Sequence, residues 1–568
     1  MNAHHRKFYF TFLALALAIS ANAVAQVSDA DKKAAQAINE TAIRSHIKFL
    51  SDDLLEGRAP GTRGGQLGEK YIASQLETLG LRPGAKAADG TPSWYQSFDI
   101  LGVTSNVPKT MTVKSGAKTL DLKFRDDFIA FTGEQKPAVG VKDAEIVFVG
   151  YGIEAPEQKW DDYKGVEVRG KILLMMNNDP ANDPNLFAGK TRLYYGRWTY
   201  KYEIAAKKGA AGAIIIHTEP SAGYKFQVVQ SSWTGEQFEL PQTSKGLEAG
   251  NALTIKVKGW ATDAASKQIA LLGGKNLDEL RTRAERRDFK PVPLGVTLSL
   301  DLTNSIRSLK TANVVGVLPG RDPVLSKEHV VYSAHHDHLG IGTPANGDSI
   351  HNGALDNASG TAAILAIAKA FAQMPADQRP RRSIMFAAVA AEESGLLGSQ
   401  KFCADPPVHP GYLAANINID GVAILGRTKD LAIVGMGKSS MDGLVKEIAA
   451  WQGRVVKGDE FPEKGFFYRS DQFNFAKIGI PATYCDAGLE VIGKPAGWGK
   501  EQFEKWEATN YHQPSDEYSD SWNLEGAVED AQLMFLVGLK VANTEQLPSW
   551  VPGDEFEAAR QKALGERK

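Results

Sequence analysis

Short apolar runs separated by polar loops dominate the C-terminal half of the chain. Runs typical of buried strands occupy 330–334, 383–389 and 413–419, and a pattern of apolar residues at helical spacing covers 364–371. Strand, loop, helix and strand in this order are typical of βαβ units. We therefore expect an α/β fold with a mixed, mostly parallel central sheet flanked by helices.

The flanking segments continue this pattern. Helical periodicity covers 29–55, 67–79 and 525–544, and strand-like alternation covers 94–100, 295–302 and 311–318. The early elements look like the start of a domain that resumes much later in the chain. The last helix is expected to cover one face of the sheet.

The pattern of apolar and polar residues changes near Ala144. Strand-like runs follow at 145–150, 171–176 and 213–217, with a helical pattern at 202–212. This segment holds no dense group of histidines and carboxylates, so it is predicted to be an inserted module that shapes access, binds partners or is purely structural. The expected divisions are 27–140 for the first part of the main domain, 141–270 for the insert, 271–550 for the main part and 551–568 for a tail.

The first 25 residues have the pattern of a secretory signal. Basic residues precede an apolar run from Phe8 to Ile19, and small residues offer cleavage after Ala23 or Ala25. No cysteine lies near these positions, so a lipid anchor is not expected. No later apolar run is long enough to cross a bilayer. We expect a periplasmic or secreted protein without a membrane anchor.

Composition narrows the function further. A chain of 568 residues favours two or more domains, and a formal net charge of −2 provides no field that would attract nucleic acid. Cys403 and Cys485 are the only cysteines, which excludes a disulfide scaffold and a cysteine-based metal site. The sequence leaves open whether these two cysteines form a disulfide bond.

Histidines and carboxylates gather at the ends of the predicted strands. Five of the eleven histidines fall between His329 and His351, Glu392 and Glu393 follow the second strand, and Asp420 follows the third. Open α/β sheets place their sites at the carboxyl ends of their strands. Imidazole and carboxylate together suit zinc or a similar divalent ion, so we expect a metal site there.

The spacing within this group suggests separate roles. In His335-x-Asp337 the strand period of two puts both side chains on one side, so His335 can bind metal while Asp337 supports it or the local backbone. Glu392 and Glu393 point in different directions, so one can bind metal while the other moves protons. The alternatives are satisfied histidines and a solvated pair of glutamates.

These residues resemble the di-zinc aminopeptidases of metallopeptidase clan MH, which share a fold with glutamate carboxypeptidase. The resemblance covers about 29–140 and 294–542, and it implies the zinc exopeptidase fold. The insert resembles the β-rich protease-associated domain. Five motifs carry the main resemblance in the order of the family: His335-x-Asp337, Gly353 to Gly360, Glu392 to Ser399, Asn418-Ile419-Asp420 and Tyr511 to Asp516.

The resemblance implies two zinc ions per chain, bridged by Asp356. His335 and Asp420 would complete one site, and Glu393 and His512 would complete the other. Glu392 would be the general base, and the hydroxyl of Tyr511 would help to hold the oxyanion.

The chain departs from the family pattern in two places. His338 and His351 stand between the first two motifs, and either could compete as a ligand. Gln472 occupies a position where many relatives have histidine, which leaves the substrate contacts open.

The function implied is hydrolysis of N-terminal residues from peptides. The alternatives are a carboxypeptidase, a glutaminyl cyclase-like enzyme or a non-catalytic, receptor-like binding protein on the same fold. The residue preferred at the N-terminus of the substrate and the oligomeric state stay open.

Overall fold

The structure is a computed structural model that describes residues 27–180, 183, 186–222, 224–243 and 254–567. The expected signal sequence at 1–25 lies outside the described residues. Within the described ranges, every helix is too short or too polar to span a membrane.

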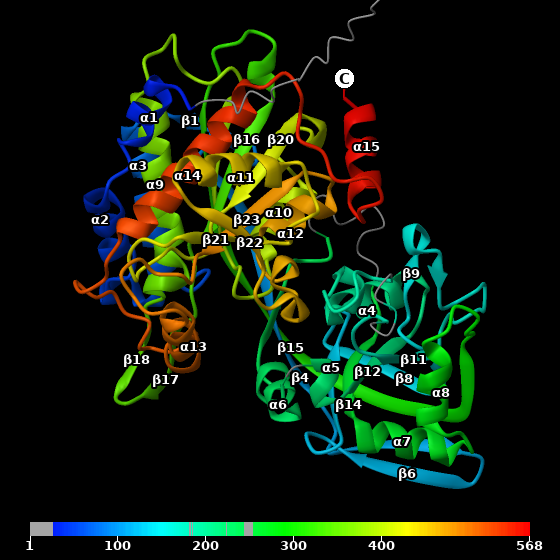
Figure 1. Cartoon of the computed structure of the whole chain (residues 1–568). Helices are drawn as coiled ribbons and strands as arrows, with labels where there is room; N and C mark the ends of the chain where they lie inside the picture. The colour runs from blue at the N-terminus through cyan, green and yellow to red at the C-terminus, as the bar shows by residue number, and fades with distance from the viewer. Residues whose placement is uncertain (1–26, 181–182, 184–185, 223, 244–253, 568) are drawn as a thin grey trace, which may run out of the picture.

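Two lobes are joined by a long antiparallel ribbon (Figure 1). The ribbon consists of β4 (Tyr95–Asn106) and β15 (Val292–Leu318), which pair from Val314 opposite Tyr95 to Thr303 opposite Asn106. The two strands expected at 295–302 and 311–318 are therefore one continuous strand. The prediction of two was wrong because the polar stretch between them pairs with β4 while its side chains face solvent.

The larger lobe is built on a mixed sheet in the order β15-β19-β16-β20-β23-β21-β22. Strand β16 pairs in parallel with β19 and β20, and β20 pairs in parallel with β23, whereas β15 and β21 run antiparallel to their neighbours β19 and β23. The expected mostly parallel α/β sheet is confirmed. The strands are β16 His329–His335, β19 Ser383–Val389, β20 Leu413–Asn418, β21 Asp430–Val434, β22 Val455–Gly458 and β23 Ala482–Ala487.

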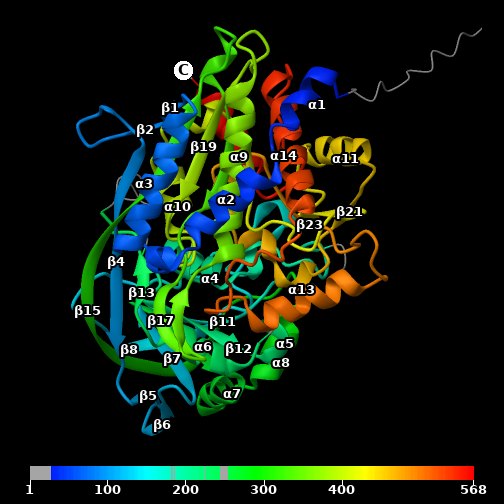
Figure 2. The same ribbon diagram turned by 90° about the vertical axis from the view of Figure 1, so that its left-hand side faces the viewer.

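Helices cover both faces of this sheet. One face packs against α1 Asp29–Ala35, α2 Glu40–Leu50, α3 Arg63–Thr78, α9 Gly360–Gln373 and α14 Glu525–Asn543, and Figure 2 views the molecule from this side. The other face packs against α10 Leu397–Ala404 and α12 Gln472–Lys477. α11 Met441–Trp451 packs into the same core as α14. The remaining helices of this lobe are α13 Trp498–Thr509 and α15 Glu557–Gly565.

The smaller lobe, called here the insert lobe, has a sheet with an apolar core on each side. Residues along β11 and β12 alternate between the two cores, with Leu174 and Ile214 in one and Leu173 and Ile215 in the other. The first core draws on side chains from Val107 to Leu302. The expected boundaries of the insert at 141 and 270 stay predictions.

The strands of the insert lobe are β5 Thr110–Ser115, β6 Lys118–Lys123, β7 Phe128–Thr132, β8 Ala138–Phe148, β11 Ile172–Met176, β12 Gly212–His217, β13 Gln237–Glu239 and β14 Val257–Thr262. Its helices are α4 Trp198–Lys207, α5 Glu219–Ala222, α6 Phe226–Trp233, α7 Asp263–Leu272 and α8 Leu277–Ala284. The short strands β9 Glu154–Ala155 and β10 Trp160–Asp161 also belong to this lobe. Short strands elsewhere are β1 Arg82–Pro83, β2 Ala85–Lys86, β3 Pro92–Ser93, β17 Gly340–Ala345 and β18 Asp348–His351.

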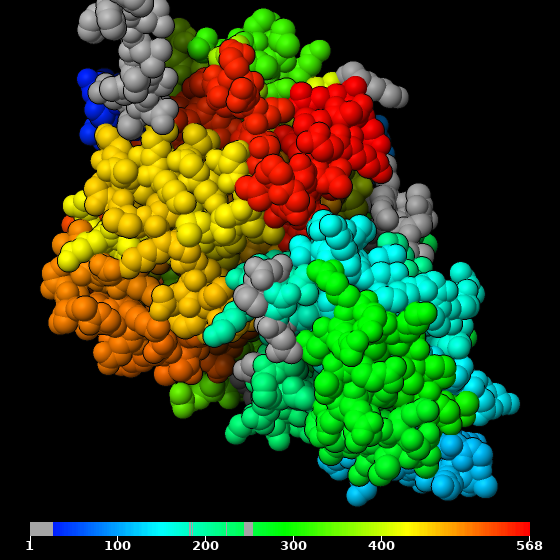
Figure 3. Space-filling model, turned by 45° about the vertical axis from the view of Figure 1, so that its right-hand side comes forward, coloured from blue at the N-terminus to red at the C-terminus, as the bar shows by residue number. Residues whose placement is uncertain are grey.

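Direct contacts also fix the insert lobe against the larger lobe, as the packed surfaces in Figure 3 show. The ring of Tyr194 packs against that of Phe473 with centroids 4.9 Å apart. Lys477 Nζ pairs with Glu203 Oε1 at 3.0 Å. Aromatic and ionic contacts therefore supplement the ribbon.

Both cysteines lie in the larger lobe. Cys403 and Cys485 are buried and free. The bridge that the sequence left open is not formed.

Gly538 gives a test of the packing between α14 and the sheet. The Tyr332 hydroxyl donates to Met534 O at 2.9 Å, and a Cβ on Gly538 would lie 1.9 Å from that hydroxyl oxygen. We expect Gly538→Ala to lower the free energy of unfolding by about 1–3 kcal/mol through overpacking. The measurement is thermal and denaturant unfolding of the variant.

Gly443 in α11 is the matched control, since a Cβ there meets nothing within 4 Å. Gly443→Ala should be neutral or stabilising by about 0.5–1 kcal/mol, because alanine favours the helix. Equal effects of the two substitutions would contradict the packing described.

Candidate metal centre

The carboxyl ends of three neighbouring parallel strands supply most of the centre. His335 ends β16, Glu392 and Glu393 lie just beyond β19, and Asp420 lies just beyond β20. Asp356 stands in the turn that precedes α9. Parallel strands end at a common edge, so their loops place these side chains together.

His335 is the centre of the first donor group. Its Nε2 lies 3.2 Å from Asp356 Oδ1 and 3.2 Å from Asp420 Oδ1. Donor atoms held about 2.0–2.2 Å from a tetrahedral zinc ion stand about 3.4 Å apart. The spacing of this group therefore fits a zinc ion.

His512 and Glu393 form a second donor group on the other oxygen of Asp356. His512 Nε2 lies 3.0 Å from Glu393 Oε2 and 3.3 Å from Asp356 Oδ2. The two oxygens of Asp356 thus face two different groups, as a bridging carboxylate would. The structure brings together all five residues of the expected ligand set.

His338 also reaches this second group. Its Nδ1 lies 2.7 Å from Glu393 Oε1, and it forms a candidate metal group with Asp356 and Glu393. His351, the other competitor, joins none of the candidate groups found among the described residues. The choice between His338 and His512 as ligand stays open at this position.

The chemistry of the buried atoms fits a cation. His338 Nε2 and Asp337 Oδ2 are buried without a hydrogen-bond partner in the described part of the chain. Unpaired buried charge is costly, and several carboxylates converge here. A divalent ion bound by nitrogen and carboxylate oxygen would compensate this charge.

Glu392 lies beside the first donor group. Its Oε2 is 4.0 Å from His335 Nε2, and its backbone amide donates to Asp337 Oδ1 at 3.2 Å. Burial raises the pKa of the Glu392 carboxyl well above its usual range, Glu393 and Asp420 add to this rise, and His335 opposes it. Asp337 thus supports the backbone that presents Glu392, as its spacing from His335 suggested.

Asp516 holds the turn that carries Asp356. Its Oδ1 accepts from the amide of Leu355 and its Oδ2 from the amide of Asp356, both at 3.0 Å. Asn357 ties the same turn to the Asp420 loop, since its Oδ1 accepts from the amide of Gly421 at 2.9 Å. The motif from Tyr511 to Asp516 contained this residue, but the sequence did not predict that Asp516 binds the backbone around Asp356.

Arg58 is a residue that sequence reasoning missed. It is fully buried, and its guanidinium donates to the carbonyls of His336 at 2.9 Å and Gly353 at 2.9 Å. Burial lowers its pKa to about 10, against the favourable charges of Asp337 and other site carboxylates. No periodic signal marks Arg58, because it lies in a turn-rich segment far from the motifs.

Tyr511 and Gln472 occupy different environments. The ring of Tyr511 stacks on that of His512 with centroids 3.9 Å apart, and Tyr511 lines the cavity. Gln472 is buried, accepts from Asn418 Nδ2 at 2.8 Å and donates to Phe467 O at 2.8 Å. Gln472 therefore supports the local backbone and does not line the cavity.

A cavity of about 910 Å³ opens over the centre and reaches the insert lobe. Asp356, Glu392 and Tyr511 line one part of it, and Arg197 and Trp198 of the insert lobe line another. Its volume is in the range of sites for small organic ligands. The insert lobe therefore forms part of the wall.

Residues 313–536 match the model of Peptidase family M28. This match confirms the resemblance to the metallopeptidases of clan MH for this segment, which holds all the candidate metal ligands.

Two curated relatives show the extent of the similarity. The chain is 34% identical over 112 residues to Aminopeptidase NAALADL1 of Rattus norvegicus, covering 19% of this chain and 13% of that protein. It is 27% identical over 323 residues to the probable lipoprotein aminopeptidase LpqL of Mycobacterium tuberculosis, covering 49% of this chain and 58% of that protein. The chain thus spans less than two thirds of either relative.

Among solved structures, the aminopeptidase from Aneurinibacillus sp. strain AM-1 aligns with 91% of this chain and 97% of its own length. The TM-score is 0.46 and the sequence identity is 18%.

Asp516 offers a test of how the centre is held. Asp516→Asn replaces one acceptor oxygen by a donor, so the amide of Leu355 or Asp356 loses its partner. We expect zinc affinity to fall about 10–100-fold, as for other changes to residues that orient ligands. Competition with a chromophoric chelator measures this affinity.

Glu517→Gln is the matched control, because Glu517 is the exposed neighbour of Asp516. It should leave zinc affinity unchanged. Unchanged affinity in Asp516→Asn would contradict the role given to Asp516.

Proposed function

We propose that the protein is a zinc-dependent aminopeptidase that hydrolyses N-terminal residues from peptides. The single observation that carries this proposal is the pair of donor groups that share Asp356, with Glu392 beside them in a cavity of peptide size. The match to Peptidase family M28 supports the same conclusion.

Two zinc ions per chain are part of the proposal. His335, Asp420 and Asp356 would hold one ion, and Glu393, His512 and Asp356 would hold the other. When bound, zinc supplies Lewis acidity, polarising the scissile carbonyl and lowering the pKa of water. The side chains of this chain bind the ions and position the peptide.

Glu392 is assigned the proton transfers. Its carboxylate would take a proton from the attacking water and pass it to the nitrogen of the leaving amine. Asp337 keeps the Glu392 backbone in place through its hydrogen bond to the amide. Tyr511, at the edge of the cavity, would donate its hydroxyl proton in a hydrogen bond to the oxyanion.

Export and the nature of the insert complete the proposal. The N-terminal pattern supports secretion or a periplasmic location. The insert lobe, with its own cores and its share of the cavity wall, supports a protease-associated domain that limits access to the centre. A carboxypeptidase on the same fold is the second candidate, because the cavity also contains arginines that suit a terminal carboxylate.

Glu392→Gln tests the proton transfers. Glutamine cannot take up the proton, so kcat should fall by about 10²–10⁴-fold while zinc content stays near that of the unchanged protein. Steady-state kinetics and elemental analysis of the same samples measure both quantities.

Glu504→Gln is the control, since Glu504 is exposed on α13. It should leave kcat unchanged. Full activity in Glu392→Gln would remove Glu392 from the chemistry.

A substrate panel tests the reaction itself. Aminoacyl-anilides and free peptides should lose their N-terminal residue, whereas peptides blocked at the N-terminus should stay intact. Chelators should abolish turnover and added zinc should restore it, because the donor atoms fit zinc. Liquid chromatography of the products identifies the bond that is cut.

Cleavage of blocked peptides at their C-terminus would replace the aminopeptidase by the carboxypeptidase. Binding of peptides without any turnover would favour the receptor-like alternative.

A further inference from the structure

Most carboxylates of the cavity wall outside the metal centre pair with lysines. The pairs are Glu203 with Lys477 at 3.0 Å, Asp430 with Lys457 at 3.1 Å, Glu460 with Lys500 at 2.7 Å, Glu507 with Lys464 at 3.4 Å, and Glu490 with Lys457. Asp486 and Asp459 also line the cavity, but neither has a lysine, arginine or histidine nitrogen within 4.0 Å in the described part of the chain. These two carboxylates are therefore available to a positive group from outside.

Strand β23 places Asp486 at the level of the candidate metal ligand Asp420. β23 and β20 are parallel neighbours, and Tyr484 on β23 is the register partner of Asn418 on β20. Asp486 and Asp420 each stand two residues further along strands that lie about 4.8 Å apart. The Tyr484 hydroxyl also donates to the backbone oxygen of Asp420 at 3.5 Å. Asp486 thus lies on the part of the wall next to the first donor group.

The side chains around Asp486 are largely apolar. On β21, the other neighbour of β23, Ala432 is paired with Asp486 and Val434 is paired with Tyr484. All four of these residues line the cavity, as the alternation of side chains along a strand requires. A carboxylate among apolar side chains suits a ligand group with an apolar stem and a cationic end.

The charges that act on Asp486 come from other carboxylates. Burial raises the pKa of the Asp486 carboxyl to about 6, the hydrogen bond from the amide of Ala487 at 2.8 Å opposes this rise, and the charges of Asp459 and Asp420 add to it. Like charges that crowd in a partly buried place are unfavourable, and an opposite charge relieves them. A cation of the substrate would therefore bind favourably beside Asp486.

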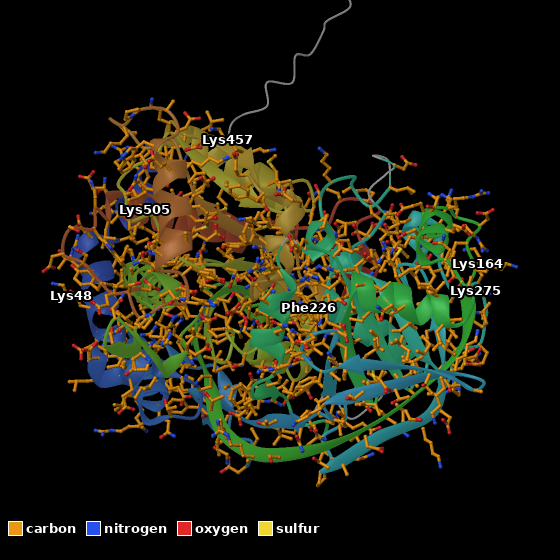
Figure 4. All side chains as sticks on the ribbon, turned by 90° about the horizontal axis from the view of Figure 1, so that it is seen from below. Lys48, Lys164, Phe226, Lys275, Lys457 and Lys505 are labelled. Carbon is orange, nitrogen blue, oxygen red and sulfur yellow. The ribbon has the colours of Figure 1, made fainter. Side chains whose placement is uncertain are left out.

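Lys457 is the lysine that the sheet brings nearest in register, and it is occupied. It is the register partner of Ala432 on β22, so Lys457 and Asp486 stand on opposite sides of Ala432. Its ammonium is held by Asp430 and Glu490, on the larger lobe (Figure 4). The chain itself thus leaves the position beside Asp486 without a cation.

The short distance to the metal centre indicates which residue of the substrate meets Asp486. In the proposed reaction the attacked carbonyl belongs to the N-terminal residue, and the side chain of that residue branches from the next carbon atom. Lysine carries its ammonium on a flexible four-carbon stem, and arginine carries a planar guanidinium on a stem of similar reach. Either side chain can extend from the centre to a wall residue one strand away.

We propose that Asp486 binds the cationic side chain of a lysine or arginine at the N-terminus of the substrate, with Asp459 adding negative charge. This inference rests on the proposed function and names its substrate class: peptides that begin with a basic residue. Asp486 acts on specificity, and the proton transfers stay with Glu392.

The experiment uses the zinc-loaded full chain and the anilides of lysine, arginine and norleucine. Norleucine has the four-carbon stem of lysine without the ammonium, and all three substrates carry the same α-amino group. We expect kcat/KM for the lysine and arginine anilides to exceed that for the norleucine anilide by about 10–100-fold, the range for hydrogen bonds to charged groups. Initial rates over a range of substrate concentrations give these values.

Variants test the assignment to Asp486. Asp486→Asn should lower kcat/KM for the lysine anilide about 10-fold or more, mainly through KM, with little effect on the norleucine anilide. Asp459→Asn should cause a smaller loss of the same preference. Glu504→Gln, the matched control, removes an exposed carboxylate of α13 outside the cavity wall and should change neither substrate.

Several results would overturn the inference. Equal kcat/KM for the lysine and norleucine anilides in the unchanged protein would exclude a site for a cationic side chain. Equal slowing of both substrates in Asp486→Asn, at an unchanged melting temperature, would mean that Asp486 acts on the α-amino group or on the centre. If Asp486→Asn does not fold, the preference of the unchanged protein and its decrease in Asp459→Asn decide the matter. Failure of the unchanged protein to cut any anilide or peptide would instead remove the proposed aminopeptidase function.

Discussion

A single carboxylate, that of Asp356, connects the two halves of the candidate metal centre. One of its oxygens faces His335 and the other faces His512. Asp516 accepts hydrogen bonds from the backbone of the same turn, and Asn357 ties the turn to the Asp420 loop. Buried carboxylates so close to one another repel, so the arrangement depends on positive charge from bound metal, from histidine and from Arg58.

The parallel sheet explains why these groups meet. β16, β19 and β20 run side by side, so their loops emerge at one edge with the spacing of neighbouring strands. The same geometry places Glu392 close to His335, just beyond the end of β19. Asp337 holds the Glu392 backbone there by accepting a hydrogen bond from its amide. Rigid strands therefore position the ligands, and loops add the residues that adjust them.

The insert lobe supplies part of the wall of the cavity over the centre. β15 and β4 carry the chain out to this lobe, and α4 returns to the cavity with Arg197 at its start. A surface formed between two lobes can differ from one member of a fold to another while the metal ligands stay in place. The candidate metal ligands and this part of the cavity wall thus come from different parts of the chain.

The amino-acid pattern alone determined the α/β class, the parallel strands and the set of residues at their ends. Apolar runs report burial directly, and polar residues that follow such runs must lie at the edge of the sheet. Only the tertiary structure decided that 295–302 and 311–318 belong to one strand, that Gln472 is buried, and that Arg58 and Arg197 reach the centre and its cavity. These outcomes depend on contacts between residues hundreds of positions apart, and local periodicity carries no information about such contacts.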